Sequence, residues 1–129
     1  MITGKEKPDS GTFKIGDTVK LGEVALTARH TPGHTKGHIA YSIPSEYSLF
    51  AADTLFSLGC GRVFEGTLDE MYHSVNQFKA LSSSTYIYCG HEYTLANIKF
   101  AQTIEPDNVA LAARAAQAAK QIADGQWTI

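Results

Sequence analysis

Three histidines lie four residues apart in the segment HTPGHTKGH, residues 30–38. Imidazole nitrogens bind zinc and related metal ions, and in a helix this spacing would place all three rings on one face. Pro32, Gly33 and Gly37 each disfavour the interior of a helix by about 1 to 3 kcal/mol. We therefore predict a tight loop after a strand that ends near His30, from which at most two of the rings share a site.

Two other segments place polar side chains just after predicted strands. Asp53 follows the apolar run LFAA, and His91 lies just beyond YIYC. Side chains at the carboxyl ends of separate strands converge readily at one edge of a sheet. Carboxylates and imidazoles are the donors that zinc, iron and manganese accept. Together with a histidine of the loop, these residues predict a metal site.

Alternating apolar residues predict the strands that carry these side chains. Residues 12–28 alternate with period two, including Phe13 and Ile15, and turn at Gly16-Asp17 and Gly22-Glu23. The segments HIAYSI and YSLFAAD predict two further strands joined by PSE, and TYIYCG predicts another.

Helical periodicity begins after a glycine-rich loop. Residues 68–81 place five apolar side chains on one side: Leu68, Met71, Val75, Phe78 and Leu81. Thr67 and Glu70 fit a capping box at the start of this helix. Two more helices are predicted, over residues 95–104 and 109–123, the second ending at Gly125. The order of strands, helix, strand and helices predicts a mixed α/β layer structure.

The composition argues against several classes of partner. The 129 residues carry a net charge of −2 with scattered Lys and Arg, so neither nucleic acid nor a membrane surface is an expected partner. Only Cys60 and Cys89 are present, without a C-x-x-C motif, which predicts neither a disulfide framework nor a thiolate zinc site. A cytoplasmic location is the expectation.

Four motifs together resemble the hydroxyacylglutathione hydrolase (glyoxalase II) family of the metallo-β-lactamase superfamily: TPGHTKGH, DTLFSLGCGRVFEGT, CGHEYT and KFAQTIEPDN. The resemblance runs from about Gly22 to Asn108. It implies an αββα sandwich, of which this chain would hold the second half, followed by carboxyl-terminal helices. Residues 1–105 would form the partial metallo-β-lactamase-like domain, and residues 106–129 the start of a helical extension.

The resemblance also implies roles for individual residues. His34 would bind a first metal ion, His91 a second, and Asp53 would bridge the two and serve catalysis. The metal would be zinc, with iron or manganese as alternatives. The substrate would be S-D-lactoylglutathione or a related S-acylglutathione, hydrolysed to glutathione and a hydroxy acid. Two segments would contact it: Arg62, Val63 and Phe64, and then His91, Glu92 and Tyr93.

The sequence departs from the family in its first part. The family's His-x-His-x-Asp-His motif, which supplies the other four metal ligands, has no counterpart in residues 1–29, and Phe64 stands where a tyrosine is frequent. A half-sandwich would leave one sheet face open, so we predict a homo-oligomer or a complementing N-terminal half as partner. Two other functions stay open: a mono-iron persulfide dioxygenase, and a non-catalytic remnant or interaction module.

Overall fold

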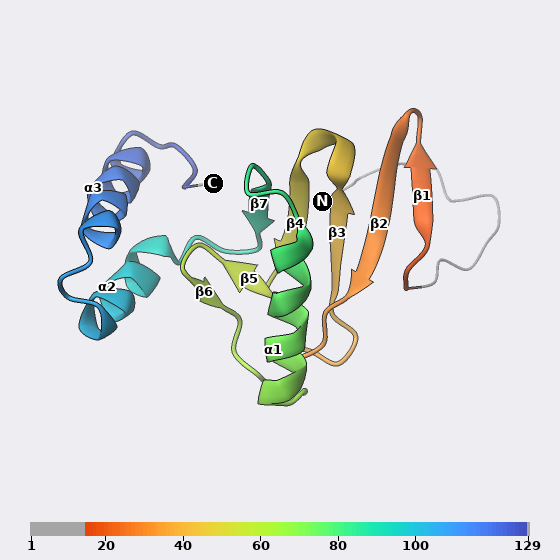
Figure 1. Cartoon of the computed structure of the whole chain (residues 1–129), viewed down its shortest axis with the longest axis horizontal. Coiled ribbons are helices and arrows are strands. Elements are labelled where there is room, and N and C mark those ends of the chain that lie inside the picture. The colour runs from red at the N-terminus through yellow and green to blue at the C-terminus, as the bar shows by residue number, and fades with distance from the viewer. Residues whose placement is uncertain (1–14, 129) are drawn as a thin grey trace.

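A five-stranded sheet carries the fold in the computed structural model, which describes residues 15–128 (Figure 1). In spatial order the strands are β1 (Thr18–Leu21), β2 (Val24–His30), β3 (Ile39–Ile43), β4 (Ser48–Ala52) and β7 (Tyr86–Cys89). Neighbours pair antiparallel except β4 and β7, which are parallel. The carboxyl ends of β2, β4 and β7 therefore meet at one edge of the sheet, as the sequence predicts.

The two faces of the sheet have different surroundings because side chains alternate along each strand. On one face, Ala40, Leu49 and Ala51 form the core with Phe78, which comes from the short 3-10 helix η2 (Gln77–Ala80). On the other face, Phe50 stacks on Tyr88 with ring centroids 5.0 Å apart, and both side chains are exposed. One face is thus covered and the other carries open aromatic rings.

The first α-helix is shorter than predicted. Helix α1 (Leu68–Asn76) has the expected capping box between Thr67 and Glu70, but the chain then tightens into η2 instead of continuing to residue 81. The tighter winding allows Phe78 to reach the sheet core. Leu68 shares the predicted apolar side of the helix but is 78% exposed, so it does not join the core.

The segment before β1 also differs from the prediction. Phe13 lies outside the described residues, and Ile15 lies in a turn, exposed, instead of in a strand. Gly16 has a φ of +91°, a conformation that favours glycine and reverses the chain. The strand that the sequence predicts around Ile15 is therefore absent at that residue.

Between β4 and α1 the chain forms a small hairpin of β5 (Leu55–Phe56) and β6 (Gly59–Cys60), and a 3-10 turn η1 (Pro44–Glu46) joins β3 to β4. The last two helices, α2 (Thr94–Ile104) and α3 (Val109–Ala123), agree with the predicted ranges to within one residue. They share a second core cluster of Ile98, Leu111 and Ala118. The division of the chain between residues 105 and 106 stays a prediction. Among the described helices, none is long and apolar enough to cross a lipid bilayer.

Candidate metal centre

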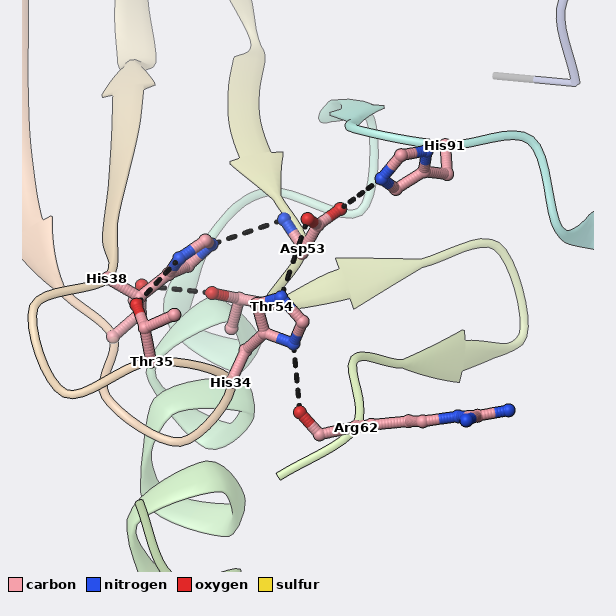
Figure 2. A network of polar contacts seen from close by, with 8 residues as sticks. His34, Thr35, His38, Asp53, Thr54, Arg62 and His91 are labelled. Atoms are coloured by element: carbon pink, nitrogen blue, oxygen red, sulfur yellow. Dashed lines mark hydrogen bonds and ion pairs between the residues drawn. The ribbon is translucent and has the colours of Figure 1, made fainter. Parts of the chain in front are cut away.

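Asp53 lies between two histidines at the edge of the sheet where β2, β4 and β7 end (Figure 2). Its Oδ2 is 3.5 Å from Nε2 of His34, and its Oδ1 is 3.4 Å from Nε2 of His91. The three side chains come from the β2–β3 loop, the end of β4 and the segment after β7. Each imidazole therefore faces a different oxygen of the same carboxylate.

The loop that carries His34 is held by α1 and η2. Gly33 packs so closely on α1 that an added Cβ would lie 2.8 Å from the Met71 Cα, and its φ of +142° also requires glycine. Ser74 of α1, fully buried, donates its hydroxyl to the Pro32 carbonyl at 2.7 Å. Gln77 donates to the carbonyl of His30 at 2.9 Å. The helix thus determines where the loop turns.

The hydrogen bond made by His34 determines its tautomer. Its Nδ1 lies 2.9 Å from the carbonyl oxygen of Arg62, which can only accept, so Nδ1 carries the proton. The lone pair of Nε2 then points toward Asp53 and is free to bind a metal ion. A histidine ligand held through its second nitrogen in this way is the usual arrangement in metal proteins.

His38 holds the backbone at Asp53. The Asp53 N–H donates to His38 Nε2 at 3.2 Å, so that nitrogen must be unprotonated. Burial lowers the pKa of His38 from its ordinary value of 6.5, the charge of His34 lowers it further, and Asp53 opposes them. His38 therefore supports the backbone at Asp53 and does not face its carboxylate oxygens as His34 and His91 do.

Two glycines let the chain pass close to Asp53, one beside its carboxylate and one beside its backbone carbonyl. A Cβ added to Gly90 would lie 2.5 Å from Asp53 Oδ1, and one added to Gly61 would clash with the Asp53 carbonyl. Oδ1 is buried and accepts no hydrogen bond within the described part of the chain. Because a buried carboxylate oxygen without a partner is costly, this atom fits a site completed by a bound cation.

His91 is more open than His34: its side chain is 54% exposed, against 18% for His34. Its ring stacks on Tyr93 with centroids 5.2 Å apart, and Phe56 lies edge-on to Tyr93 at the same separation. The carboxylate of Glu92 accepts hydrogen bonds from Thr94 and Thr128. Burial raises the pKa of Glu92, but these hydrogen bonds outweigh that effect and leave it below its ordinary value.

The segment predicted to contact substrate runs past His34. Phe64 lies against the His34 ring with centroids 5.0 Å apart and is exposed, and Val63 is half-buried. The Arg62 carbonyl accepts a hydrogen bond from the His34 ring, whereas the Arg62 side chain points away from Asp53 (Figure 2). Of this segment, the Phe64 ring and the Arg62 carbonyl therefore lie beside His34 in the cluster formed by His34, Asp53 and His91.

A cleft of about 780 Å³ borders this cluster on the side of β7. Its walls include Tyr86 and Tyr88 of β7, His91, Arg114 of α3 and Trp127. His34 and Asp53 do not line it, so the cleft lies beside the cluster and not over it.

The cluster by itself is incomplete as a metal site. Among residues 15–128, no three or more His, Cys, Asp and Glu side chains are grouped to hold one ion. The opposite placement of His34 and His91 explains this, since each oxygen of Asp53 has only one imidazole near it. Nitrogen and carboxylate donors nevertheless suit zinc, iron or manganese.

Several supporting residues have no signal in the sequence. Ser74 and Gln77 are ordinary helix residues until the loop packs on them, and Phe56 is one apolar residue among many. Gly90 precedes a predicted ligand, which hints at a close backbone approach, but only the structure shows that Asp53 is what approaches it.

Two family models divide the chain between them. Residues 2–91 match the metallo-beta-lactamase superfamily, and residues 92–129 match the carboxyl terminus of hydroxyacylglutathione hydrolase. A hydroxyacylglutathione hydrolase of Rhodopseudomonas palustris (strain BisB5) is 54% identical over 114 residues, which cover 88% of this chain and 45% of that protein. One of Bradyrhizobium sp. (strain ORS 278) is 51% identical over the same length, with the same coverage.

Solved structures share the architecture. ETHE1 from Myxococcus xanthus aligns with a TM-score of 0.57 and 32% identity over 63% of this chain and 36% of that one. The BLEG-1 B3 metallo-beta-lactamase aligns with a TM-score of 0.58 and 28% identity over 67% of this chain and 43% of that one. The chain spans about 45% of the curated relatives named above.

Proposed function

The chain belongs to the metallo-beta-lactamase superfamily, and from this we propose that it forms part of the active site of a glyoxalase II-type thioester hydrolase. The observation that carries the proposal is Asp53, with one imidazole at each oxygen and a buried Oδ1 without a hydrogen bond among the described residues. The relatives named hydroxyacylglutathione hydrolase support S-D-lactoylglutathione or a related S-acylglutathione as substrate.

His34, Asp53 and His91 are the residues that would hold the metal, with zinc as the first choice and iron or manganese as alternatives. When bound, such an ion lowers the pKa of a coordinated water to about 7 and polarises a carbonyl oxygen. The chain's contribution is to orient these donors. The Arg62 carbonyl accepts the Nδ1 proton of His34 and so turns Nε2 toward Asp53, and His38 accepts a hydrogen bond from the Asp53 backbone.

The two segments predicted to contact substrate would bind its thiol part. Arg62 offers a guanidinium to a glutathione carboxylate, which it can bind through two parallel hydrogen bonds. Tyr93 offers a hydroxyl to the peptide, and Phe64 an apolar surface. We include Val63, His91 and Glu92 among these contacts because they adjoin those three residues.

The remaining ligands would come from the part of the family's domain that these residues do not cover. The chain covers 45% of its relative, and residues 1–29 contain no His-x-His-x-Asp-His motif. Three donors from this chain hold at most one ion loosely, so we expect little turnover from the chain alone. Hydrolysis should appear when a segment carrying that motif joins it.

A complementation experiment tests this proposal. The chain, with zinc, would be mixed with the part of the Rhodopseudomonas palustris relative that it does not cover, and hydrolysis of S-D-lactoylglutathione followed. We expect chelator-sensitive turnover well above that of either polypeptide alone, abolished by Asp53→Asn and retained by the exposed control Asp107→Asn. If the mixture is folded and loaded with zinc but shows no turnover, the proposed hydrolase activity is refuted.

Two alternatives give different results in the same assay. Oxygen consumption by the iron-loaded mixture with glutathione persulfide, without thioester hydrolysis, would identify a persulfide dioxygenase. If the mixture binds no metal and shows no turnover, the result would favour a non-catalytic interaction module.

A further inference from the structure

A partly buried hydrogen-bond network joins the segment after His91 to the carboxyl-terminal segment of the described chain. Glu92 Oε1 accepts from the Thr94 backbone N–H at 3.0 Å, and Oε2 accepts from the Thr128 hydroxyl at 2.7 Å. Because the Thr128 proton is used there, the Thr94 hydroxyl must donate to Thr128, across 2.7 Å. Thr94 and Thr128 are both buried, so the bond between their hydroxyls is shielded from water, whereas Glu92 is exposed and its two bonds are partly buried.

Helix α3 holds Thr128 from the other side. Arg114 donates to the Thr128 carbonyl and, at 3.1 Å, to the side-chain oxygen of Gln121. The neighbouring Trp127 is 76% exposed, so apolar burial of its ring does not secure this segment. Polar contacts therefore determine where Thr128 lies.

The two candidate histidine ligands differ in how they are held. His34 is oriented through its own ring nitrogen by the Arg62 carbonyl. Within the described residues, the ring of His91 makes no hydrogen bond of this kind; it lies against Asp53 and stacks on Tyr93. Two contacts hold its backbone: the Cys89 thiol donates to the His91 carbonyl at 3.2 Å, and the carboxylate of the next residue, Glu92, is bonded to Thr94 and Thr128.

We propose that Glu92 and Thr128 form a clamp that positions His91 toward Asp53, so that the carboxyl-terminal segment controls one side of the metal centre. The clamp rests on the proposed function, since it concerns a proposed ligand. Glu92 is a positioning residue in this scheme because its carboxylate acts through the backbone of His91. The clamp also explains how residues 92–129, which match a separate family model, serve a site in residues 2–91.

Substitutions at Thr128 separate positioning from general stability. Thr128→Val removes the hydroxyl at nearly constant volume, and Thr128→Ser keeps it. Thr103→Val is the matched control, because the Thr103 hydroxyl bonds only the Phe100 carbonyl of its own helix. Imidazole nitrogen–proton NMR spectra of the metal-free chain would report the His34 and His91 rings separately. A competition titration would give the zinc dissociation constant.

We expect Thr128→Val and Glu92→Ala to shift or broaden the His91 signals, to leave those of His34 in place, and to weaken zinc binding roughly 10- to 100-fold. Thr128→Ser and Thr103→Val should match the unmodified chain. If Glu92→Ala does not fold, the isosteric Thr128→Val decides the question.

Unchanged His91 signals in folded Thr128→Val would overturn the clamp, whatever the activity. If the His91 signals move as expected but the unmodified chain neither binds zinc nor supports thioester hydrolysis, the clamp stands and the proposed function fails.

Discussion

At the scale of single residues, the site depends on glycines as much as on its polar side chains. Asp53 can turn its carboxylate between two imidazoles only because Gly90 has no Cβ beside Oδ1. His38 adds a hydrogen bond to the Asp53 backbone, and that bond requires an unprotonated ring nitrogen. The position of the carboxylate therefore depends on the residues packed around it.

Gly90→Ala tests this dependence. The new methyl group would lie 2.5 Å from Asp53 Oδ1, so the carboxylate must move. We expect zinc binding to weaken about 10- to 100-fold with the thermal unfolding midpoint little changed, since the effect is on a ligand. Gly37→Ala is the matched control, because a Cβ there meets nothing within 4 Å and neither glycine has a positive φ. Equal zinc affinities of the two variants would contradict the argument.

At the scale of elements, α1 acts as a support for the β2–β3 loop. The helix starts at a capping box, packs Met71 on Gly33 and donates from Ser74 to the Pro32 carbonyl. The helix continues as η2, where the Gln77 side chain donates a hydrogen bond to the carbonyl of His30. The loop that presents His34 is thus fixed by a helix about forty residues later in the chain.

Ser74→Ala measures this support. Removing the buried hydroxyl leaves the Pro32 carbonyl without its donor, and we expect the free energy of unfolding to fall by about 1 to 2 kcal/mol. Chemical denaturation would give this value, with the exposed Ser83→Ala as control. Because the loop also loses its fixed position, zinc affinity should fall in Ser74→Ala and hold in the control. A stability loss no larger than that of Ser83→Ala would show that the hydrogen bond does not secure the loop.

At the scale of the whole molecule, one face of the sheet stays open. Val19, Phe50, Tyr86 and Tyr88 are exposed, and register places Tyr41, Phe50 and Tyr88 in one row across β3, β4 and β7. No charged side chain belongs to this row, so two copies can stack their aromatic rows without burying an ion. We expect the isolated chain to self-associate through this face.

Light scattering over a range of protein concentrations checks this expectation. The unmodified chain should show the mass of a dimer or a larger assembly, and Phe50→Lys should reduce it by placing a charge in the row. Phe100→Lys changes an exposed aromatic residue on α2, away from the sheet, and should leave the mass unaltered. A monomeric mass of the unmodified chain at high concentration would rule the interface out.

The sequence predicts most of the elements and proposes the residues of the candidate site. Pro32 and the glycines excluded a helical histidine stripe, and period-two and period-3.6 patterns located most strands and all three helices, because these signals depend on local backbone preferences. It also places Asp53 and His91 directly after strands. Because the carboxyl ends of parallel strands meet at one edge of a sheet, these two residues are expected to lie close together. Its errors were local: the extension of α1 to residue 81 and a strand at Ile15.

The contacts that hold the candidate site appear first in the folded structure. The tautomer of His34 depends on a carbonyl 28 residues away, and the Glu92–Thr128 contact joins residues 36 apart. The close approach of Gly90 to Asp53 depends on the parallel pairing of β4 and β7. No local pattern records such contacts, because they arise when separate elements pack and the chain must satisfy each buried polar atom with whatever lies beside it.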